Sequence, residues 1–240
     1  MLPRRNERAL SEQSRGLTLV EVLISGALIS VVMASVYVLY IAMHDTLTKG
    51  ELKADLQQNA RVGLAQMTQE IRMAGYDPPV GSPPKPVSPQ IVLVPRAPLR
   101  AATAQCFSFI ADVSGEGTAD QITYEFDSVK KTLRRRVDNW SGSPKYEFAG
   151  GTFQPLAQSI DSLTFSYFDV NNVELKMTNY ASTHRCPPVK GAPVENIWQL
   201  TFEQLAQVRR VAITLKSQGS RPGVPSESYT LTSDVRLRNL

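Results

Sequence analysis

Histidine and cysteine are scarce in this chain of 240 residues, which holds two of each. Two histidines (His44 and His184) and two cysteines are too few to bind a metal ion without further ligands. The chain also lacks a phosphate-binding glycine loop ending in Lys-Ser or Lys-Thr, a nucleophile elbow and a His-Glu-x-x-His motif. We therefore expect a protein that is not an enzyme and that binds neither a cofactor nor a metal.

Charge is nearly absent from residues 17–43, where Glu21 is the one ionisable carboxylate among apolar and small side chains. The run is about 27 residues long, which is enough to cross a bilayer with some tilt. A carboxylate at that depth costs roughly 2.5–3.5 kcal/mol on insertion scales. Because leucine would serve a simple anchor better, we expect Glu21 to have a charged partner.

The first 16 residues are polar, with Arg4, Arg5, Arg8 and Arg15 against Glu7 and Glu12. Arginines that flank a span stay in the cytoplasm, so the C-terminal part is predicted to lie outside it. A secretory signal has a short apolar region followed by a small-residue cleavage site. Here the apolar run is too long for that. A cut after Gly16 is more plausible, since it would keep the run and expose a new amino group on Leu17.

Residues 15–21, Arg-Gly-Leu-Thr-Leu-Val-Glu, resemble the signal of type IV prepilins. The resemblance implies that a prepilin peptidase cuts after Gly16 and methylates the amino group of Leu17, a position that is usually phenylalanine in that family. It also implies that Glu21 directs assembly by pairing with the Leu17 amine of a neighbouring subunit. A pair with the amine of its own chain, where the helix dipole also favours a carboxylate, remains open.

The helical period continues beyond the membrane, because residues 44–76 carry apolar side chains at spacings of three and four. The stripe consists of Leu52, Leu56, Ala60, Gly63 or Leu64, Met67, Ile71 and Ala74. Gly75 is a natural C-terminal cap, and Pro78 and Pro79 prevent continuation. The sequence thus predicts one long helix with a membrane half at 17–43 and an amphipathic half at 44–76.

A proline-rich loop at 77–90 precedes a β-rich domain at 91–240. Strands are predicted at 91–94, 107–113, 121–126, 132–137, 162–169, 208–216 and 228–238, with a short helix near 194–207. The predicted fold class is α+β and pilin-like: a long N-terminal helix packed on an antiparallel sheet.

Three segments are similar to the PilW branch of minor pilins: residues 58–61, 71–76 and 230–240. That branch is similar to the J-type minor pseudopilin of type II secretion. The resemblance implies a subunit of the inner membrane, with its C-terminal domain in the periplasm, that later enters an extracellular pilus. Its implied partners are the prepilin peptidase and other minor and major pilins, contacted through N-terminal helices, and it is a candidate tip adhesin.

Two alternatives to a pilus subunit stay open at this point. A J-like pseudopilin of type II secretion would have the same architecture. A membrane-tethered periplasmic binding protein would never polymerise, would keep its leader and would tolerate leucine at position 21.

Cys106 and Cys186 predict one disulfide, because an exported chain meets an oxidising environment. The closed loop would hold about 80 residues, for which the chain-entropy view gives up to roughly 4 kcal/mol. Two separate buried thiols are the alternative.

The formal charge of +4 falls to +2 once a leader with four arginines and two glutamates is removed. That value is too small to imply a nucleic-acid partner, and none is expected. A basic run at Lys130, Lys131, Arg134, Arg135 and Arg136 is interpreted as a solvated strand edge. The acidic stretch at 112–120 begins like a calcium loop but has Thr123 where a glutamate is required, so a turn is the better interpretation.

Overall fold

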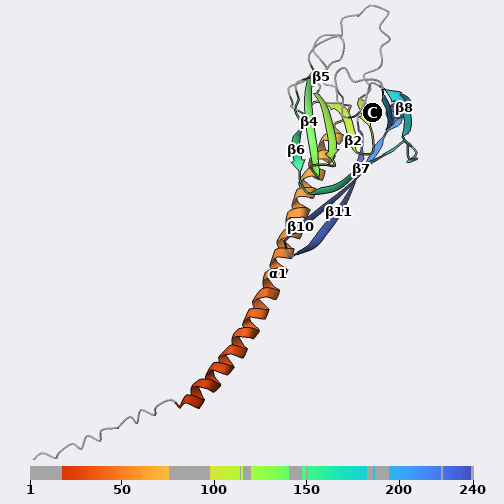
Figure 1. Cartoon of the computed structure of the whole chain (residues 1–240). Coiled ribbons are helices and arrows are strands. Elements are labelled where there is room, and N and C mark those ends of the chain that lie inside the picture. Colours follow the sequence, from red (N-terminus) through yellow and green to blue (C-terminus); the bar gives the residue numbers. More distant parts are fainter. Residues whose placement is uncertain are drawn as a thin grey trace, which may run out of the picture. The chain divides into compact units, whose positions relative to one another are not determined.

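A computed structural model of the chain describes residues 18–75, 98–113, 115, 120–140, 148–149, 151–182, 186, 195–222 and 224–238. The chain divides into two compact units, Met1–Thr48 and Lys49–Leu240. One helix, α1 (Leu19–Arg72), begins in the first unit and ends in the second (Figure 1).

Helix α1 confirms the predicted long helix, although it ends at Arg72, four residues before the predicted end at residue 76. A tight turn follows Arg72, in which the amide of Ala74 donates to the carbonyl of Ile71 at 3.1 Å. Gly75 has φ +84°, the left-handed conformation that glycine adopts without steric cost. Its amide donates to Ile110 O at 2.9 Å, so the turn is fixed to the sheet.

The predicted apolar stripe is buried in the second unit, which confirms the amphipathic half. Its buried members are Leu52, Leu56, Ala60, Gly63, Leu64, Met67, Ile71 and Ala74. Glu70 is also buried in this stripe, although it is not part of the predicted apolar pattern. In contrast, the side chains from Thr18 to Leu47 are exposed.

Six antiparallel strands form the larger sheet, in the order β1-β2-β3-β4-β5 with β6 paired to β4. They are β1 (Leu99–Ala102), β2 (Cys106–Ala111), β3 (Asp120–Asp127), β4 (Thr132–Trp140), β5 (Phe148–Ala149) and β6 (Gln154–Ala157). Strands β3 and β4, which were predicted at 121–126 and 132–137, form a hairpin. Its turn is held by Asp127, whose carboxylate accepts from the amides of Val129 and Lys130.

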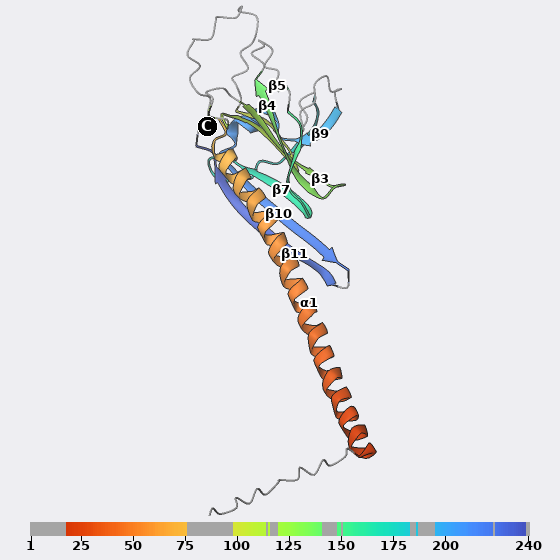
Figure 2. The same cartoon turned by 90° about the vertical axis from the view of Figure 1, so that its left-hand side faces the viewer.

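A second sheet has the order β11-β10-β7 and runs beside α1 (Figure 2). Its strands are β7 (Ile160–Phe168), β10 (Arg210–Arg221) and β11 (Val224–Arg236). Side chains alternate along β7, because Leu163, Phe165 and Tyr167 are buried while Thr164 is exposed. A third sheet pairs β8 (Thr178–Ser182) with β9 (Glu195–Gln199).

An aromatic cluster joins the two larger sheets. Phe107 of β2 lies 5.8 Å from Phe165 and 5.5 Å from Tyr167 of β7, measured between ring centroids. The Tyr167 hydroxyl donates to Thr103 O at 2.9 Å, and burial raises the pKa of this tyrosine well above its usual value. The domain therefore has one apolar core between its sheets and the outer half of α1.

The predicted helix near 194–207 is wrong over its first half. Glu195–Gln199 is strand β9, and α2 covers only Phe202–Gln207. Thr201 caps α2 by accepting from the Gln204 amide, while the Gln204 side chain accepts from the Thr201 amide. This capping box marks the start of the helix, and strand pairing with β8 uses the residues before it.

The strands β1, β5, β6 and β8 were not predicted from the sequence, nor was the division of the strands among three sheets. The predicted strand at 91–94 and the proline-rich loop at 77–90 lie outside the described residues.

Candidate functional site

The N-terminus of α1 carries the first part of the candidate site. Thr18 precedes the helix, and its hydroxyl accepts from the Glu21 amide at 3.3 Å. Thr18 and Glu21 have the Thr-x-x-Glu spacing of a capping box. The Glu21 side chain is exposed in the first turn, where the dipole of the helix favours a negative charge. Gly16 and Leu17 lie outside the described residues, so cleavage and methylation there stay predictions.

The apolar half of α1 is suited to a single membrane span. One window of 18 residues has a mean hydropathy of 2.4, and this is the one helix among the described residues that is long and apolar enough to cross a bilayer. Ser30 and Ser35 donate their hydroxyl protons to the carbonyls of Gly26 and Val31 one turn earlier. Both hydroxyls are therefore satisfied within the helix, which lowers the cost of placing them in lipid.

A buried ionic network attaches the outer half of α1 to the larger sheet. Glu70 Oε2 accepts from the Tyr124 hydroxyl at 2.6 Å and from Arg135 Nε at 2.9 Å. Its other oxygen accepts from Gln66 Nε2 at 3.0 Å. Burial, together with the charge of Glu70, raises the pKa of Tyr124 far above its usual value. Burial alone would lower the pKa of Arg135, but the hydrogen bond and charge of Glu70 overcome it and raise that pKa.

The second sheet contacts α1 along the β10–β11 hairpin. Arg221 donates to Glu51 at 3.2 Å and to Asp55 at 3.0 Å. Further along the helix, the hydroxyls of Thr68 and Ser233 share a hydrogen bond of 3.3 Å. Contacts from residue 51 to residue 70 thus fix the outer part of α1 on both sheets.

The predicted disulfide is present between Cys106 and Cys186, and it spans 80 residues of sequence. Cys106 is the first residue of β2 and is buried. The bond therefore ties the larger sheet to the segment between β8 and β9. Separate thiols, the alternative weighed from the sequence, are not what the structure contains.

The basic run is not a strand edge, because β4 pairs with β3 on one side and with β5 and β6 on the other. Each of its three arginines has a carboxylate partner. Arg134 contacts Glu125 and Asp127, Arg135 contacts Glu70, and Arg136 contacts Asp138. These guanidinium groups are engaged within the domain, so they do not form an open basic surface.

The acidic stretch begins with a turn. Asp112 accepts from the amide of Gly115 at 2.7 Å, which is the hydrogen bond of an Asx-type turn. Residues 114 and 116–119 lie outside the described part of the chain. Within the described part, three or more His, Cys, Asp or Glu side chains do not come together as a metal site.

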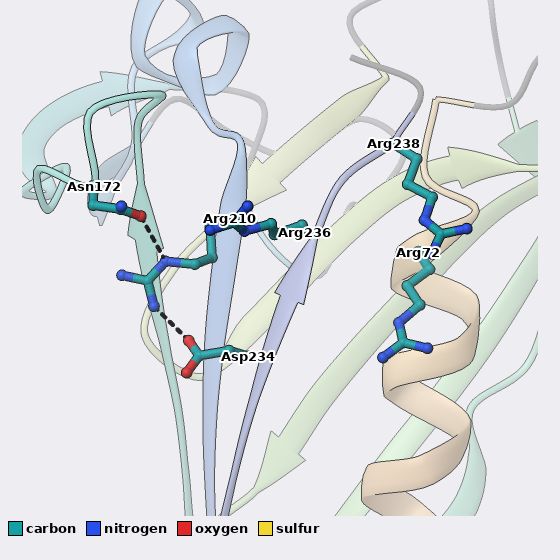
Figure 3. Close-up of a pocket in the computed structure, with 6 residues that line it drawn as sticks. All are labelled: Arg72, Asn172, Arg210, Asp234, Arg236 and Arg238. Atoms are coloured by element: carbon teal, nitrogen blue, oxygen red, sulfur yellow. Dashed lines mark hydrogen bonds and ion pairs between the residues drawn. The ribbon is translucent and has the colours of Figure 1, made fainter.

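Two features of the second unit were not predicted from the sequence. One is Glu70, whose partners lie 54 and 65 residues further along the chain. The other is a pocket of about 700 Å³ at the C-terminal end of α1, lined mainly by arginines (Figure 3). The alternation of Asp234, Arg236 and Arg238 was a signal for this pocket, because alternate residues of a strand share a face.

Comparison of the chain with protein-family models gives no match, and comparison with curated proteins gives none either.

Proposed function

We propose that this chain is a minor type IV pilin of PilW type, made as a precursor whose leader, residues 1–16, is removed after Gly16. The observation that carries the proposal is helix α1. Its first half is an apolar, exposed segment with one acid in the first turn, and its second half is built into a sheet domain. A membrane anchor alone would need neither the acid nor a helix that continues without a break into the domain.

The proposed mechanism begins with burial of the apolar half in the inner membrane, with the sheet domain in the periplasm. In assembly the same surface leaves lipid and packs among the N-terminal helices of other minor and major pilins. Lipid and helix surfaces are similarly apolar, so hydrophobic burial alone gives little selectivity for this step. Glu21 supplies selectivity, because its charge is stabilised where a free amine of a processed subunit meets it.

The attachment of α1 to the sheets suits a subunit that is moved by its helix. Glu70, Tyr124 and Arg135 connect the helix to the larger sheet through charged hydrogen bonds. A displacement of the outer helix would have to break these bonds inside the core. The domain therefore follows the helix, and the subunit would take its place in a complex that primes assembly at the filament tip.

The test combines one processing variant with one assembly variant in cells that carry the filament system. Gly16→Arg is expected to leave a longer chain with an unmethylated N-terminus, measured by mass spectrometry. Glu21→Gln keeps the size and polarity of the side chain but removes its charge. It is expected to insert and be processed normally, yet to enter sheared filaments about tenfold less.

Ser35→Ala is the matched control, because it changes another polar side chain in the same apolar segment. Its incorporation should equal that of the unchanged protein. Normal incorporation of Glu21→Gln would contradict the proposal. A mature protein that keeps Met1 would also contradict it and would favour a tethered periplasmic binding protein.

A further inference from the structure

A groove runs between the C-terminal end of α1 and strand β11, within the second unit. Two adjoining pockets of about 700 and 670 Å³ form it, and Arg72 lines both. The helix side is contributed by Arg61, Leu64, Ala65, Thr68, Gln69 and Arg72. The strand side includes Ser233 and Asp234, followed by Arg236 and Arg238.

The groove is strongly basic. Four arginines line the first pocket and a fifth, Arg61, lines the second, against a single carboxylate, Asp234. Net positive charge gathered in a hollow raises the local concentration of anions. The whole chain carries a formal charge of only +4, so the high density of positive charge belongs to the groove and not to the chain in general.

Arg210 is already engaged. Its guanidinium contacts Asp234 at 2.5 Å and Asn172 at 3.2 Å, and it lies 3.8 Å from the centroid of the Phe168 ring (Figure 3). Asp234 is therefore neutralised by Arg210. This leaves the other arginines of the pocket without compensation from the one acid nearby.

Arg72, Arg236 and Arg238 are exposed and have no carboxylate partner among the residues that the structure describes. Arg236 and Arg238 lie on the outward face of this segment, because Val235 and Leu237, which alternate with them in the sequence, are buried. Arg72 lies opposite on the last turn of α1 (Figure 3). Three guanidinium groups, none with a carboxylate partner in the described part of the chain, thus line the same hollow from two elements.

We propose that this groove binds an extended acidic segment of a partner protein, with carboxylates on Arg72, Arg236 and Arg238. Guanidinium groups match carboxylates with two parallel hydrogen bonds, which gives both affinity and orientation. Thr68, Gln69 and Ser233 add side chains that can bond to a peptide backbone. The proposal lies wholly in the second unit and does not depend on the pilin assignment.

The lining of the groove favours a protein over a nucleic acid. Neither pocket is lined by an aromatic side chain on which a base could stack, and the face of Phe168 is covered by Arg210. A peptide needs no such stacking surface, because its carboxylates bind the guanidinium groups directly.

The test is fluorescence anisotropy with the full chain in detergent micelles. The probe is a labelled peptide with glutamate at alternate positions, and its glutamine counterpart is the uncharged control. The glutamate peptide is expected to bind at low salt and to weaken as salt rises. The glutamine peptide and the double variant Arg236→Gln/Arg238→Gln should each bind about tenfold more weakly.

The matched control is Lys130→Gln/Lys176→Gln, which removes the same charge from exposed positions outside the groove. Its affinity should stay unchanged, and the unfolding midpoints of both double variants should match. A similar loss in the lysine control would overturn the proposal, since only net charge would then matter. It would also be overturned if the glutamate peptide did not bind, or if an oligothymidylate of equal charge bound more tightly through the same arginines.

Discussion

Glu70 shows how one side chain can decide where a helix sits. Its carboxylate is buried in a stripe that is otherwise apolar, and an uncompensated charge there would cost several kcal/mol. Tyr124, Arg135 and Gln66 supply hydrogen bonds to both of its oxygens. The network therefore specifies which residues of the helix face β3 and β4. Apolar contacts alone would fix this rotation of the helix less strictly.

Removal of the Tyr124 hydroxyl is expected to weaken this network. Tyr124→Phe should lower the free energy of unfolding of the domain by about 1.5–3 kcal/mol, the range for a hydrogen bond to a charged group. Chemical unfolding followed by near-ultraviolet circular dichroism measures the change. Tyr229→Phe is the matched control, because the Tyr229 side chain is half-buried and its hydroxyl has no hydrogen bond within the described residues. Equal effects of the two variants would contradict the role of the network.

The same variant should change the response to alkali. The pKa of Tyr124 is raised in the folded state, so above about pH 10 the unfolded chain loses this proton and the folded chain keeps it. The stability contributed by the neutral hydroxyl is complete below that pH and falls as pH rises further. Tyr124→Phe should therefore make the alkaline decline shallower than in the unchanged protein, and an identical slope would contradict this.

Single residues were predictable where the pattern is local. The burial of Phe165 and Tyr167 follows from alternation in one strand, and the left-handed Gly75 follows from its place after the helical stripe. The role of Glu70 was not predictable, because a glutamate in a helix is usually exposed. Its burial depends on partners that only the folded sheet brings near.

Among the secondary-structure elements, helix α1 packs very closely against the larger sheet at Gly63. A Cβ on Gly63 would lie 3.1 Å from Ala157 Cβ and 3.2 Å from Leu133 Cδ2. A Cβ on Gly50 of the same helix would meet nothing within 4 Å. Both glycines weaken the helix by about 1 kcal/mol relative to alanine, so only their surroundings differ.

Leucine at these two positions should have opposite effects. Gly63→Leu forces β4 and β6 away from the helix and should lower the free energy of unfolding by about 1–3 kcal/mol. Gly50→Leu should leave it unchanged or raise it by up to about 1 kcal/mol through helix propensity. Thermal and denaturant unfolding of both variants measure the difference. A Gly63→Leu protein as stable as the Gly50→Leu protein would show that the close contact is not used.

The elements were predicted best where periodicity is strong and least well where short segments pair. Strands β10 and β11 and the helix α1, all predicted as elements, have long regular patterns. The segment 194–207 was misassigned because its few apolar residues, among them Ile197, Trp198 and Leu200, fit a strand or a helix equally well. The Thr201–Gln204 spacing was the signal that could have placed the helix start correctly.

For the chain taken together, the sequence predicted the α+β class and the disulfide, while the grouping of strands needed the structure. Strand β7 does not pair with β6 or β8, the strands next to it in the sequence. It pairs with β10, which begins more than 40 residues after β7 ends. Such a choice depends on long-range packing. The arginine groove has the same origin, since α1 and β11 lie at opposite ends of the sequence.

The disulfide stabilises this long-range arrangement by restricting the unfolded chain. A bond that closes 80 residues removes many extended conformations from the unfolded state, and its loss should cost about 2–4 kcal/mol.

Cys186→Ala is the better variant, because Cys106 is buried in β2 and its replacement would also remove packing. The reductant dithiothreitol should lower the unfolding midpoint of the unchanged protein to that of Cys186→Ala and should leave the variant itself unaffected. If the reductant lowered both midpoints alike, or neither, the bond would not hold the sheets together.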